Sequence, residues 1–310
     1  MSASERYCIG YALQSNKVKT FIRPSLLDHA AHNGIVLVTI DPTLPLTDQA
    51  PFHCILHKVY DQNWIQNLRE FTTKSPTTVI VDPPDRIQRL HNRISMLDAV
   101  NRVRITEKFD LGVPEQVAIT DSDELKKKKD LELKFPAIAK PLEANGTAAS
   151  HEMFLVFNAD GLEKILKESK NAMVVQVFVN HGGVVFKVYV VGDRHVKCVK
   201  RRSMPDISPE DHGDSDGGVM PFSQISNSND EVNLNLKEVE MPPDEIVEEV
   251  ARSLREELGL RLFNFDLIRD CNGKYFVIDI NYFPGYEKMP DYEPVLTDFL
   301  LDLVQNKPTN

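Results

Sequence analysis

Apolar runs alternate with helical stretches over the first ninety residues, and this pattern predicts a mostly parallel sheet flanked by helices. Strand-like runs of branched and aromatic residues occur at 7–13, 34–40, 54–60 and 77–83. Between them, residues 23–34 begin with an early Pro and end in Gly, as helices commonly do. Residues 61–74 and 85–103 repeat large apolar side chains at helical spacing, which predicts one further helix in each range.

The pattern changes after about residue 130, because the later strands follow one another with short Gly-containing turns, as in an antiparallel meander. The predicted strands lie at 134–140, 154–158, 172–180, 184–191 and 195–202, and the predicted helices at 161–169, 242–259 and 294–304. Residues 205–240 are rich in Ser, Asp, Asn and Gly and are predicted as a long loop. In the helix at 242–259, Asp244 is the expected N-cap and Gly259 lies just past the end.

Residues 262–282 hold two apolar runs around Asn272-Gly273, a dipeptide typical of a two-residue hairpin turn. Pairing outward from that turn sets Ile268 opposite Val277. The same register sets Asp266 directly opposite Asp279. The strand period of two then places Asn281 on the face that carries Asp279.

The opposed acids in this hairpin predict a metal site. Two carboxylates that face each other across a ladder repel, and a bound cation would reverse that effect. Asp266, Asp279 and Asn281 offer only oxygen ligands, which suit Mg²⁺ held by one or two carboxylates plus substrate phosphates. The alternative is a solvent-facing side of a strand, on which these polar residues mark the exterior.

Composition restricts the classes of function. The 310 residues carry a net charge of −10, which argues against a broad nucleic-acid surface. No apolar run approaches the ~20 residues of a membrane span, and the N-terminus lacks the apolar core of a signal peptide. Four scattered cysteines without a CxxC pair indicate reduced thiols in a cytosolic protein. No interface pattern stands out, so we expect a monomer in the cytoplasm, with the nucleus as a further location.

Basic residues in unusual places predict a pocket for a polyanion. Lys187 interrupts an apolar strand, where lysine is rarely buried without a partner, although a lysine at a sheet edge is the alternative. Residues 197–202 add Lys197, Lys200, Arg201 and Arg202, a run that is otherwise a solvated face. Lys140 ends a strand before a small-residue loop, a context that suits phosphate; a surface lysine is the alternative there. Lys17, Arg93 and His151 join this pocket only if the fold brings them together.

These features together resemble a known family. A strand-end Lys, a basic antiparallel sheet and a terminal Asp…DxN hairpin are similar to an ATP-grasp enzyme. The segments "SHEM", "VVQVFVNHGGVVFKVYVVGD", "VKCVKRRSMPDI", "FNFDLIRD" and "VIDINYFPGYEKMP" resemble the inositol-tetrakisphosphate 1-kinase or inositol-1,3,4-trisphosphate 5/6-kinase family, in particular its plant-type members. The resemblance extends over essentially the whole chain.

The resemblance implies an α/β (α+β) ATP-grasp fold. Residues 1–90 would form an N-terminal Rossmann-like domain with a parallel sheet. Residues 91–182 would form the central ATP-grasp subdomain, and residues 183–310 the C-terminal subdomain with the metal-binding hairpin. The last two would be built on antiparallel sheets.

The resemblance also implies roles for individual residues. ATP would contact Arg93, Lys140, Gln176, Val177, Phe178, Val179, Asn180, Lys187, Ser203, Ser223 and Ser226. The inositol phosphate would contact Lys17, His151, Lys187, Asn281 and Gly285. Asp266, Asp279 and Asn281 would hold magnesium, in agreement with the hairpin argument. Lys187 and His151 are the catalytic candidates, and binding of a phosphate is an equal alternative for His151.

The activity so implied is transfer of the γ-phosphoryl group of ATP, the co-substrate, to a hydroxyl of an inositol tris- or tetrakisphosphate at the 1-, 5- or 6-position. Plant-type members also convert the hexakisphosphate to a pyrophosphate. Two alternatives stay open at this point. One is an ATP-grasp ligase that joins a carboxylate to an amine, and the other is a non-catalytic inositol phosphate sensor. Neither nucleic acid nor a membrane is an expected partner.

Overall fold

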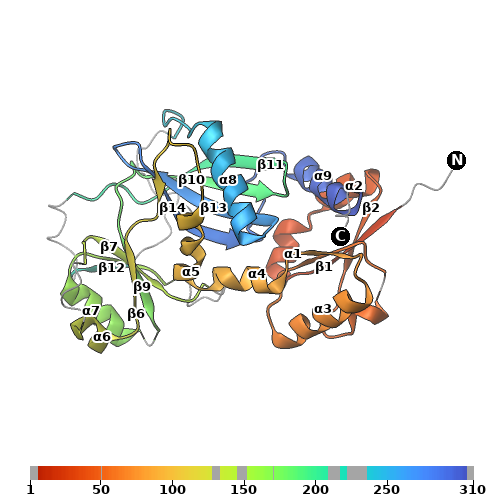
Figure 1. The fold of residues 1–310 in the computed structure, drawn as a ribbon, viewed down its shortest axis with the longest axis horizontal. Helices are drawn as coiled ribbons and strands as arrows, with labels where there is room; N and C mark the ends of the chain where they lie inside the picture. The colour runs from red at the N-terminus through yellow and green to blue at the C-terminus, as the bar shows by residue number, and fades with distance from the viewer. Residues whose placement is uncertain are drawn as a thin grey trace.

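A computed structural model describes residues 6–49, 51–127, 133–144, 152–169, 171–208, 217–221 and 236–305. Within this part, the chain forms three sheets that are flanked by helices (Figure 1). No helix in the described ranges is long and apolar enough to cross a membrane.

The N-terminal sheet is parallel and confirms the four strands predicted there, each somewhat shorter than its apolar run. Its strand order is β2 (Ile35–Thr39), β1 (Tyr7–Ala12), β3 (Cys54–His57) and β4 (Val79–Val81). The accompanying helices are α1 (Ser15–Phe21), α2 (Pro24–His32), α3 (Gln62–Lys74) and the 3₁₀ helix η1 (Leu46–Asp48). The Asp61 carboxylate accepts the backbone N–H of Trp64 and so caps α3.

The single helix predicted over 85–103 is wrong. The chain instead forms α4 (Pro84–Gln88), η2 (Arg89–His91), α5 (Arg93–Asp98) and η3 (Val100–Arg102). The break falls at Asn92, which is extended and bonds through its side chain to the N–H groups of Ile94 and Ser95. An asparagine that caps a new helix ends the preceding one, and Arg93 therefore starts a helix of its own.

The central sheet is antiparallel and carries its own helices. Its strand order is β12 (Val219–Pro221), β8 (Phe154–Val156), β7 (Ala137–Pro141), β9 (Met173–Val177) and β6 (Gln116–Ile119). Helices α6 (Ser122–Lys127) and α7 (Ala159–Glu168) lie along it (Figure 1). Two expectations fail here: β9 pairs with β6 and β7 rather than with β10, so the meander is not continuous, and β12 lies within the predicted loop 205–240.

The third sheet contains the predicted hairpin. Its strand order is β11 (His195–Arg202), β10 (Val184–Val191), β13 (Leu262–Arg269), β14 (Tyr275–Tyr282) and β5 (Leu111–Gly112). Helices α8 (Asp244–Leu258) and α9 (Tyr292–Gln305) accompany it. Gly259 ends α8 in the left-handed conformation with φ of 66°, as predicted, but Asp244 is the first helical residue rather than the N-cap.

The hairpin turn differs from its prediction, but the predicted pairing of Asp266 with Asp279 is confirmed. Asp270 closes a five-residue turn, because its carboxylate accepts the N–H groups of Asn272 and Lys274. Near this turn Ile268 pairs with Phe276 rather than with Val277. A β-bulge between Asp266 and Leu267 then shifts the register by one residue, and Asp266 pairs with Asp279 after all.

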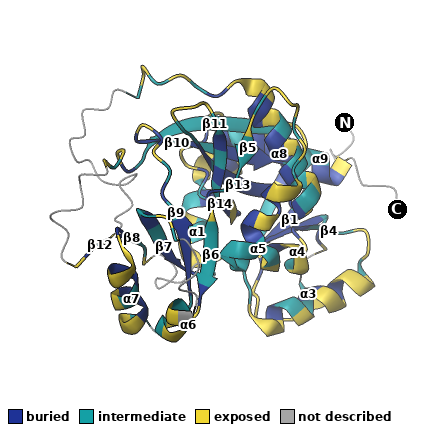
Figure 2. Cartoon of the chain, turned by 60° about the vertical axis from the view of Figure 1, so that its left-hand side comes forward, coloured by how far each residue is buried: buried dark blue, intermediate teal, exposed yellow. Residues whose placement is uncertain are grey.

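The described residues form a main apolar core and three smaller clusters, one of them on the second face of the N-terminal sheet beneath α3. One continuous cluster joins the N-terminal sheet to the third sheet through α8 and α9, whereas the central sheet has a separate core beneath α7. Figure 2 shows the outer faces of α3 and α7 exposed and most of β13 buried. The domain boundaries at residues 90 and 182 stay a prediction. Strand β5 belongs to the predicted central subdomain but joins the third sheet, and β12 belongs to the predicted C-terminal subdomain but joins the central sheet.

Candidate active site

A cleft of about 420 Å³ is lined by residues of the central and third sheets, together with Lys17 in α1 and Lys58 directly after β3. Its ionisable lining residues include six bases and two acids, namely Lys17, Lys58, Arg93, Lys140, Lys187, Arg202, Asp266 and Asp279. This local excess of positive charge lies in a chain whose net charge is −10. A cleft with such lining concentrates anionic ligands.

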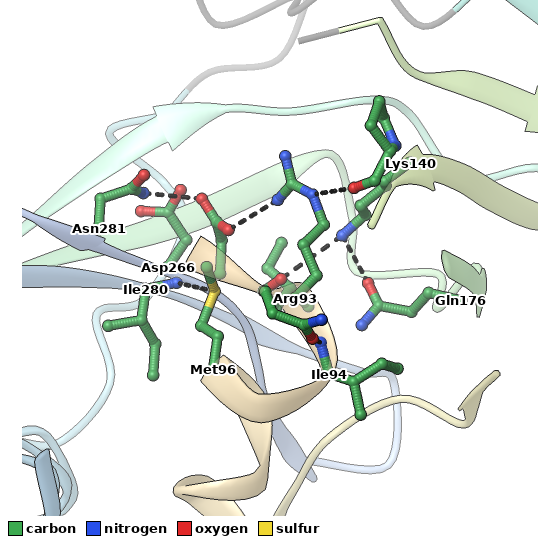
Figure 3. Close-up of polar contacts among 12 residues, drawn as sticks. Arg93, Ile94, Met96, Lys140, Gln176, Asp266, Ile280 and Asn281 are labelled. Atoms are coloured by element: carbon green, nitrogen blue, oxygen red, sulfur yellow. Dashed lines mark hydrogen bonds and ion pairs between the residues drawn. The ribbon is translucent and has the colours of Figure 1, made fainter. Parts of the chain in front are cut away.

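The two acids lie face to face, and each has a cation beside it. Arg93 Nη1 lies 3.1 Å from Asp279 Oδ1, and Lys187 Nζ lies 3.5 Å from Asp266 Oδ1. Asn281 Nδ2 donates to Asp279 Oδ2 at 2.7 Å (Figure 3). The expected repulsion is therefore offset by residues of the chain itself. Burial, together with the nearby Asp279, still raises the pKa of Asp266, and Lys187 opposes that rise.

The donor set fits a divalent cation that takes oxygen ligands. The described residues contain no cluster of three or more His, Cys, Asp or Glu side chains that could hold a metal alone. Two carboxylates and one amide are nevertheless the partial set that Mg²⁺ uses when phosphates and water complete its shell. The acids line a cleft, with 22% and 25% of the Asp266 and Asp279 side chains exposed, so the solvent-facing alternative does not describe them.

Lys140 is buried at the junction of the central and third sheets. Its Nζ donates to Gln176 Oε1 at 2.7 Å and to the carbonyl of Ile278 at 3.5 Å (Figure 3). Ile278 is the residue left without a partner in the hairpin register, so the bulge supplies this carbonyl. Burial and the adjacent Arg93 lower the pKa of Lys140 to about 8. A cation so placed offers a point charge to a phosphate.

Arg93 ties the broken helix to both sides of the cleft. Its Nε donates to the carbonyl of Pro141 in β7 at 3.0 Å, while Nη1 contacts Asp279 in β14. The backbone N–H of Arg93 also bonds to the carbonyl of Leu142. The Asn92 cap that breaks the predicted helix is what places Arg93 here.

Lys58 lines the opposite end of the cleft and was not among the predicted site residues. Its Nζ donates to the carbonyls of Tyr282 and Phe283 at 2.8 and 3.0 Å. Burial and the neighbouring Lys17 lower the pKa of Lys58 to about 7. Phe283 adopts a left-handed φ of 44°, a strain that is concentrated at functional sites. The signal available in the sequence was a lysine directly after the buried strand "CILH".

Tyr60 and His91 form a second unpredicted feature of this end. Both line the cleft, and their rings meet edge to face with centroids 4.6 Å apart. Burial raises the pKa of Tyr60, and burial together with Lys58 lowers the pKa of His91. Both side chains are therefore neutral near pH 7, between the basic residues of this end.

The structure brings most of the predicted site residues together. Lys17, Arg93, Lys140, Lys187, Ser203, Asp266, Asp279, Asn281 and Gly285 all line the cleft. Ser203 Oγ lies 2.8 Å from His181 Nε2, and His181 Nδ1 lies 2.6 Å from the carbonyl of Val179. His151, Ser223 and Ser226 lie outside the described residues, so their roles stay predictions.

The segment 176–180 lies behind the cleft lining. Gln176 holds Lys140, and Phe178 is buried in a small apolar cluster with Met204. Asn180 exchanges hydrogen bonds with the backbone of Ile207. Val177 and Val179 are also absent from the lining of the cleft as described. Contacts of this segment with ATP stay a prediction.

The basic run on β11 reaches the cleft only in part. Lys197 forms an ion pair with Asp291, and Lys200 donates to the carbonyl of Val239, so neither lines the cleft. Arg201 donates to the hydroxyl of Tyr189, and Arg202 lines the cleft. Of the four bases predicted to join the polyanion pocket from this run, Arg202 lines the cleft as described, and a contact of Lys200 or Arg201 with phosphate stays a prediction.

Comparison with known proteins finds one family over most of the chain. Family models for the inositol 1,3,4-trisphosphate 5/6-kinase pre-ATP-grasp and ATP-grasp domains match residues 8–87 and 105–302. The chain is 52% identical to inositol-tetrakisphosphate 1-kinase 1 of Arabidopsis thaliana, over 99% of this chain and 98% of that protein. It is also 52% identical to inositol-tetrakisphosphate 1-kinase 2 of Glycine max, over 98% of each.

Solved structures that are distant in sequence share the fold. D-alanine–D-alanine ligase from Bacillus anthracis, complexed with ATP, superposes with a TM-score of 0.59 at 14% identity and covers 98% of this chain and 97% of its own. An ATP-grasp RimK domain protein from Sphaerobacter thermophilus gives 0.59 at 16% identity, over 94% of this chain and 99% of its own. These likenesses establish an ATP-grasp fold.

Proposed function

We propose the function of the cleft from the family of the chain, which belongs to the inositol 1,3,4-trisphosphate 5/6-kinase family. The proposed reaction transfers the γ-phosphoryl group of ATP to a hydroxyl of an inositol tris- or tetrakisphosphate. The family is an ATP-grasp family of inositol phosphate kinases that use ATP with a divalent metal. The observation that carries the proposal is one cleft that combines an opposed acid pair with six Lys or Arg side chains.

The nucleotide end of the cleft supplies charge neutralisation. Transfer of a phosphoryl group depends mainly on positioning and on electrostatic stabilisation of the phosphate oxygens. Arg93 and Lys187 stand beside the acid pair at the distances given above, and Lys140 lies within electrostatic range of both acids. All three are placed to contact the phosphates of ATP. Asp266, Asp279 and Asn281 would hold a divalent ion, which we propose to be Mg²⁺ and which neutralises phosphate charge when bound.

The acceptor end supplies the contacts to the inositol phosphate. Lys17 and Lys58 lie within mutual electrostatic range, and burial lowers the pKa of both. Lys187 also lowers the pKa of Lys17, so the two ends of the cleft adjoin. A polyanion would satisfy this crowded group of cations. A carboxylate and an amine, the substrates of a ligase, would leave most of the positive charge unpaired.

The test is a substrate panel. The protein is incubated with ATP, Mg²⁺ and inositol tris-, tetrakis- and hexakisphosphates, and each product isomer is assigned by NMR. We expect one added phosphate on a tris- or tetrakisphosphate, and the assigned isomer identifies the 1-, 5- or 6-hydroxyl. Conversion of the hexakisphosphate to a pyrophosphate would extend the same chemistry.

Matched variants locate the activity in the cleft. Lys187→Ala removes a cleft lysine on β10, whereas Lys197→Ala removes a lysine on the adjacent β11 that pairs with Asp291 outside the cleft. Lys187→Ala should lower kcat/KM, and Lys197→Ala should leave it unchanged. Binding of inositol phosphates without any ATP consumption would instead indicate a sensor. ADP release that requires a carboxylate and an amine would indicate a ligase.

A further inference from the structure

Asn264 is a buried polar residue in the floor of the cleft. It lies in β13 two residues before Asp266, so the two side chains project from the same face of the strand. The residue is fully buried, lines the cleft and pairs with Asn281 across the hairpin. A buried polar side chain requires hydrogen-bond partners, and these partners define its role.

The amide of Asn264 holds one oxygen of Asp266. Asn264 Nδ2 donates to Asp266 Oδ1 at 3.1 Å, and Lys187 Nζ approaches the same oxygen at 3.5 Å. Among the described residues, Asp266 Oδ2 has no hydrogen-bond partner. A hydrogen bond and an ion pair on the same oxygen restrict rotation of the carboxylate and leave the other oxygen available. Figure 3 shows this carboxylate beside Asn281.

The oxygen of the Asn264 amide indicates that the hydrogen bond to Asp266 is the reason for an asparagine at this position. Asn264 Oδ1 is buried without a hydrogen-bond partner in the described structure. Flipping the amide would set this oxygen against Asp266 Oδ1, and two acceptors repel. An unpartnered buried acceptor destabilises a fold, and a leucine of similar volume would avoid that cost. Packing therefore does not account for the residue, whereas orientation of Asp266 does.

We propose that Asn264 is a positioning residue that fixes Asp266 with Oδ2 presented to a divalent cation. The inference rests on the proposed role of Asp266 as a metal ligand. Groups that orient a ligating side chain affect metal binding strongly, and their loss typically weakens metal affinity about 10–100-fold. Among the described residues the Asn264 side chain forms a hydrogen bond to Asp266 and to no base, so we expect inositol phosphate binding not to depend on it.

The experiment measures binding of Mn²⁺, as a spectroscopic probe for the divalent site, to the protein with ADP by electron paramagnetic resonance. Asn264→Leu removes the amide while it preserves volume, and Asn264→Ala removes the amide and leaves a cavity. We expect both variants to bind Mn²⁺ at least about 10-fold more weakly, with KM for the inositol phosphate unchanged. A packing role predicts instead that Ala is less stable than Leu and that Mn²⁺ affinity is normal in both.

Two controls separate the inference from its premise. Asp266→Asn tests the metal site itself: if it retains wild-type Mn²⁺ affinity, the proposed site is wrong. If Asp266→Asn loses Mn²⁺ while both Asn264 variants keep wild-type affinity, only the positioning role is overturned. Thr297→Val removes another buried polar group, bonded to His29 far from the cleft, and should leave Mn²⁺ affinity unchanged. Thermal unfolding confirms that each variant folds, and if one Asn264 variant does not, the other decides.

Discussion

The N-terminal sheet and the central sheet both flank the cleft, but they are attached to the third sheet in different ways. One face of the N-terminal sheet shares a continuous apolar core with it, and the other face packs against α3. Buried polar bonds reinforce that junction, since Asp82 Oδ2 accepts the N–H groups of Arg261 and Leu262, and the Tyr282 hydroxyl donates to the carbonyl of His57.

The central sheet, by contrast, packs around its own core and meets the third sheet through polar contacts at the cleft and through a small apolar cluster that includes Phe178 and Met204. Lys140 reaches the carbonyl of Ile278, and Arg93 links Pro141 to Asp279. Because apolar burial is the dominant stabilising term in folding, the acceptor end of the cleft is built into the main core. The nucleotide end depends instead on a few charged groups that also serve the ligand.

If the nucleotide end depends on a few charged groups, we expect the largest effect on turnover from a change at the contact between Arg93 and Asp279. Asp279→Asn keeps an acceptor for Arg93 but removes one of two carboxylates from the proposed metal site. We expect turnover to fall by about 100–1,000-fold, the scale seen when one electrostatic contact to a transition state is lost. Steady-state kinetics at saturating Mg²⁺ measures it, and near-normal turnover would contradict the metal assignment.

The effect of this substitution on the fold should be small. Repulsion between the opposed acids, taken alone, would predict that removing Asp279 stabilises the protein. Arg93 offsets that repulsion, so we expect Asp279→Asn to unfold close to the wild-type temperature. A large rise in the unfolding temperature would show that the acids are not compensated.

Two leucines test the division of the core. Leu300 in α9 and Leu162 in α7 are both fully buried, the first in the shared core and the second in the central core. Each change to Ala should reduce the free energy of unfolding by about 2–5 kcal/mol. Hydrogen exchange should quicken in both the N-terminal and third sheets for Leu300→Ala, but only in the central sheet for Leu162→Ala. Matching patterns in the two variants would refute the division.

Asp82 tests the buried junction by pH. Burial raises its pKa from 3.8 to about 6, so the folded protein binds this proton more tightly than the unfolded chain does. The contribution of Asp82 to stability therefore falls as the pH rises from about 4 to about 6 and stays low above that range. Asp82→Asn should be more stable than wild type by about 1–3 kcal/mol at pH 8 and by little at pH 4. Denaturant unfolding at the two pH values checks this difference.

The smallest expected effect is a difference in the pH dependence of KM between the two substrates, set by Lys58 at one end of the cleft and Lys140 at the other. The pKa of Lys58 is about 7 and that of Lys140 about 8, so each loses its proton in the ligand-free protein as the pH rises through that value. A bound anion favours the charged form, and binding should therefore take up protons between about pH 7 and 9. KM for the inositol phosphate should rise several-fold over this range, and KM for ATP should begin to rise about one pH unit higher.

Lys58→Arg provides the matched control for this prediction, because arginine stays charged throughout. The variant should flatten the pH dependence of KM for the inositol phosphate and leave that for ATP in place. Calorimetry in buffers of different ionisation enthalpy counts the protons directly. Equal profiles for wild type and Lys58→Arg would remove Lys58 from the acceptor end.

Local patterns predicted the elements well where one signal dominated. Strands of the N-terminal sheet followed from apolar runs, and Gly259 ended α8 as expected. The pattern failed where a polar side chain competed with it. Asn92 capped a new helix inside an apolar stripe, and Asp270 organised a wider turn than Asn272-Gly273 predicted. Such side-chain bonds to nearby N–H groups compete with secondary structure, and periodicity does not register them.

The sequence alone indicates which residue types carry the chemistry. The strand period of two is a local property, so Asp279 and Asn281 could be placed on one face without any knowledge of the fold, whereas Asp266 faces Asp279 because the β-bulge restores the register that the wider turn shifts. How the charge of these residues is neutralised, and what lies opposite them, depends on the tertiary structure. Arg93 is 186 residues from Asp279, and Lys58 is 224 residues from Tyr282. No local period relates residues so distant; packing of the three sheets does.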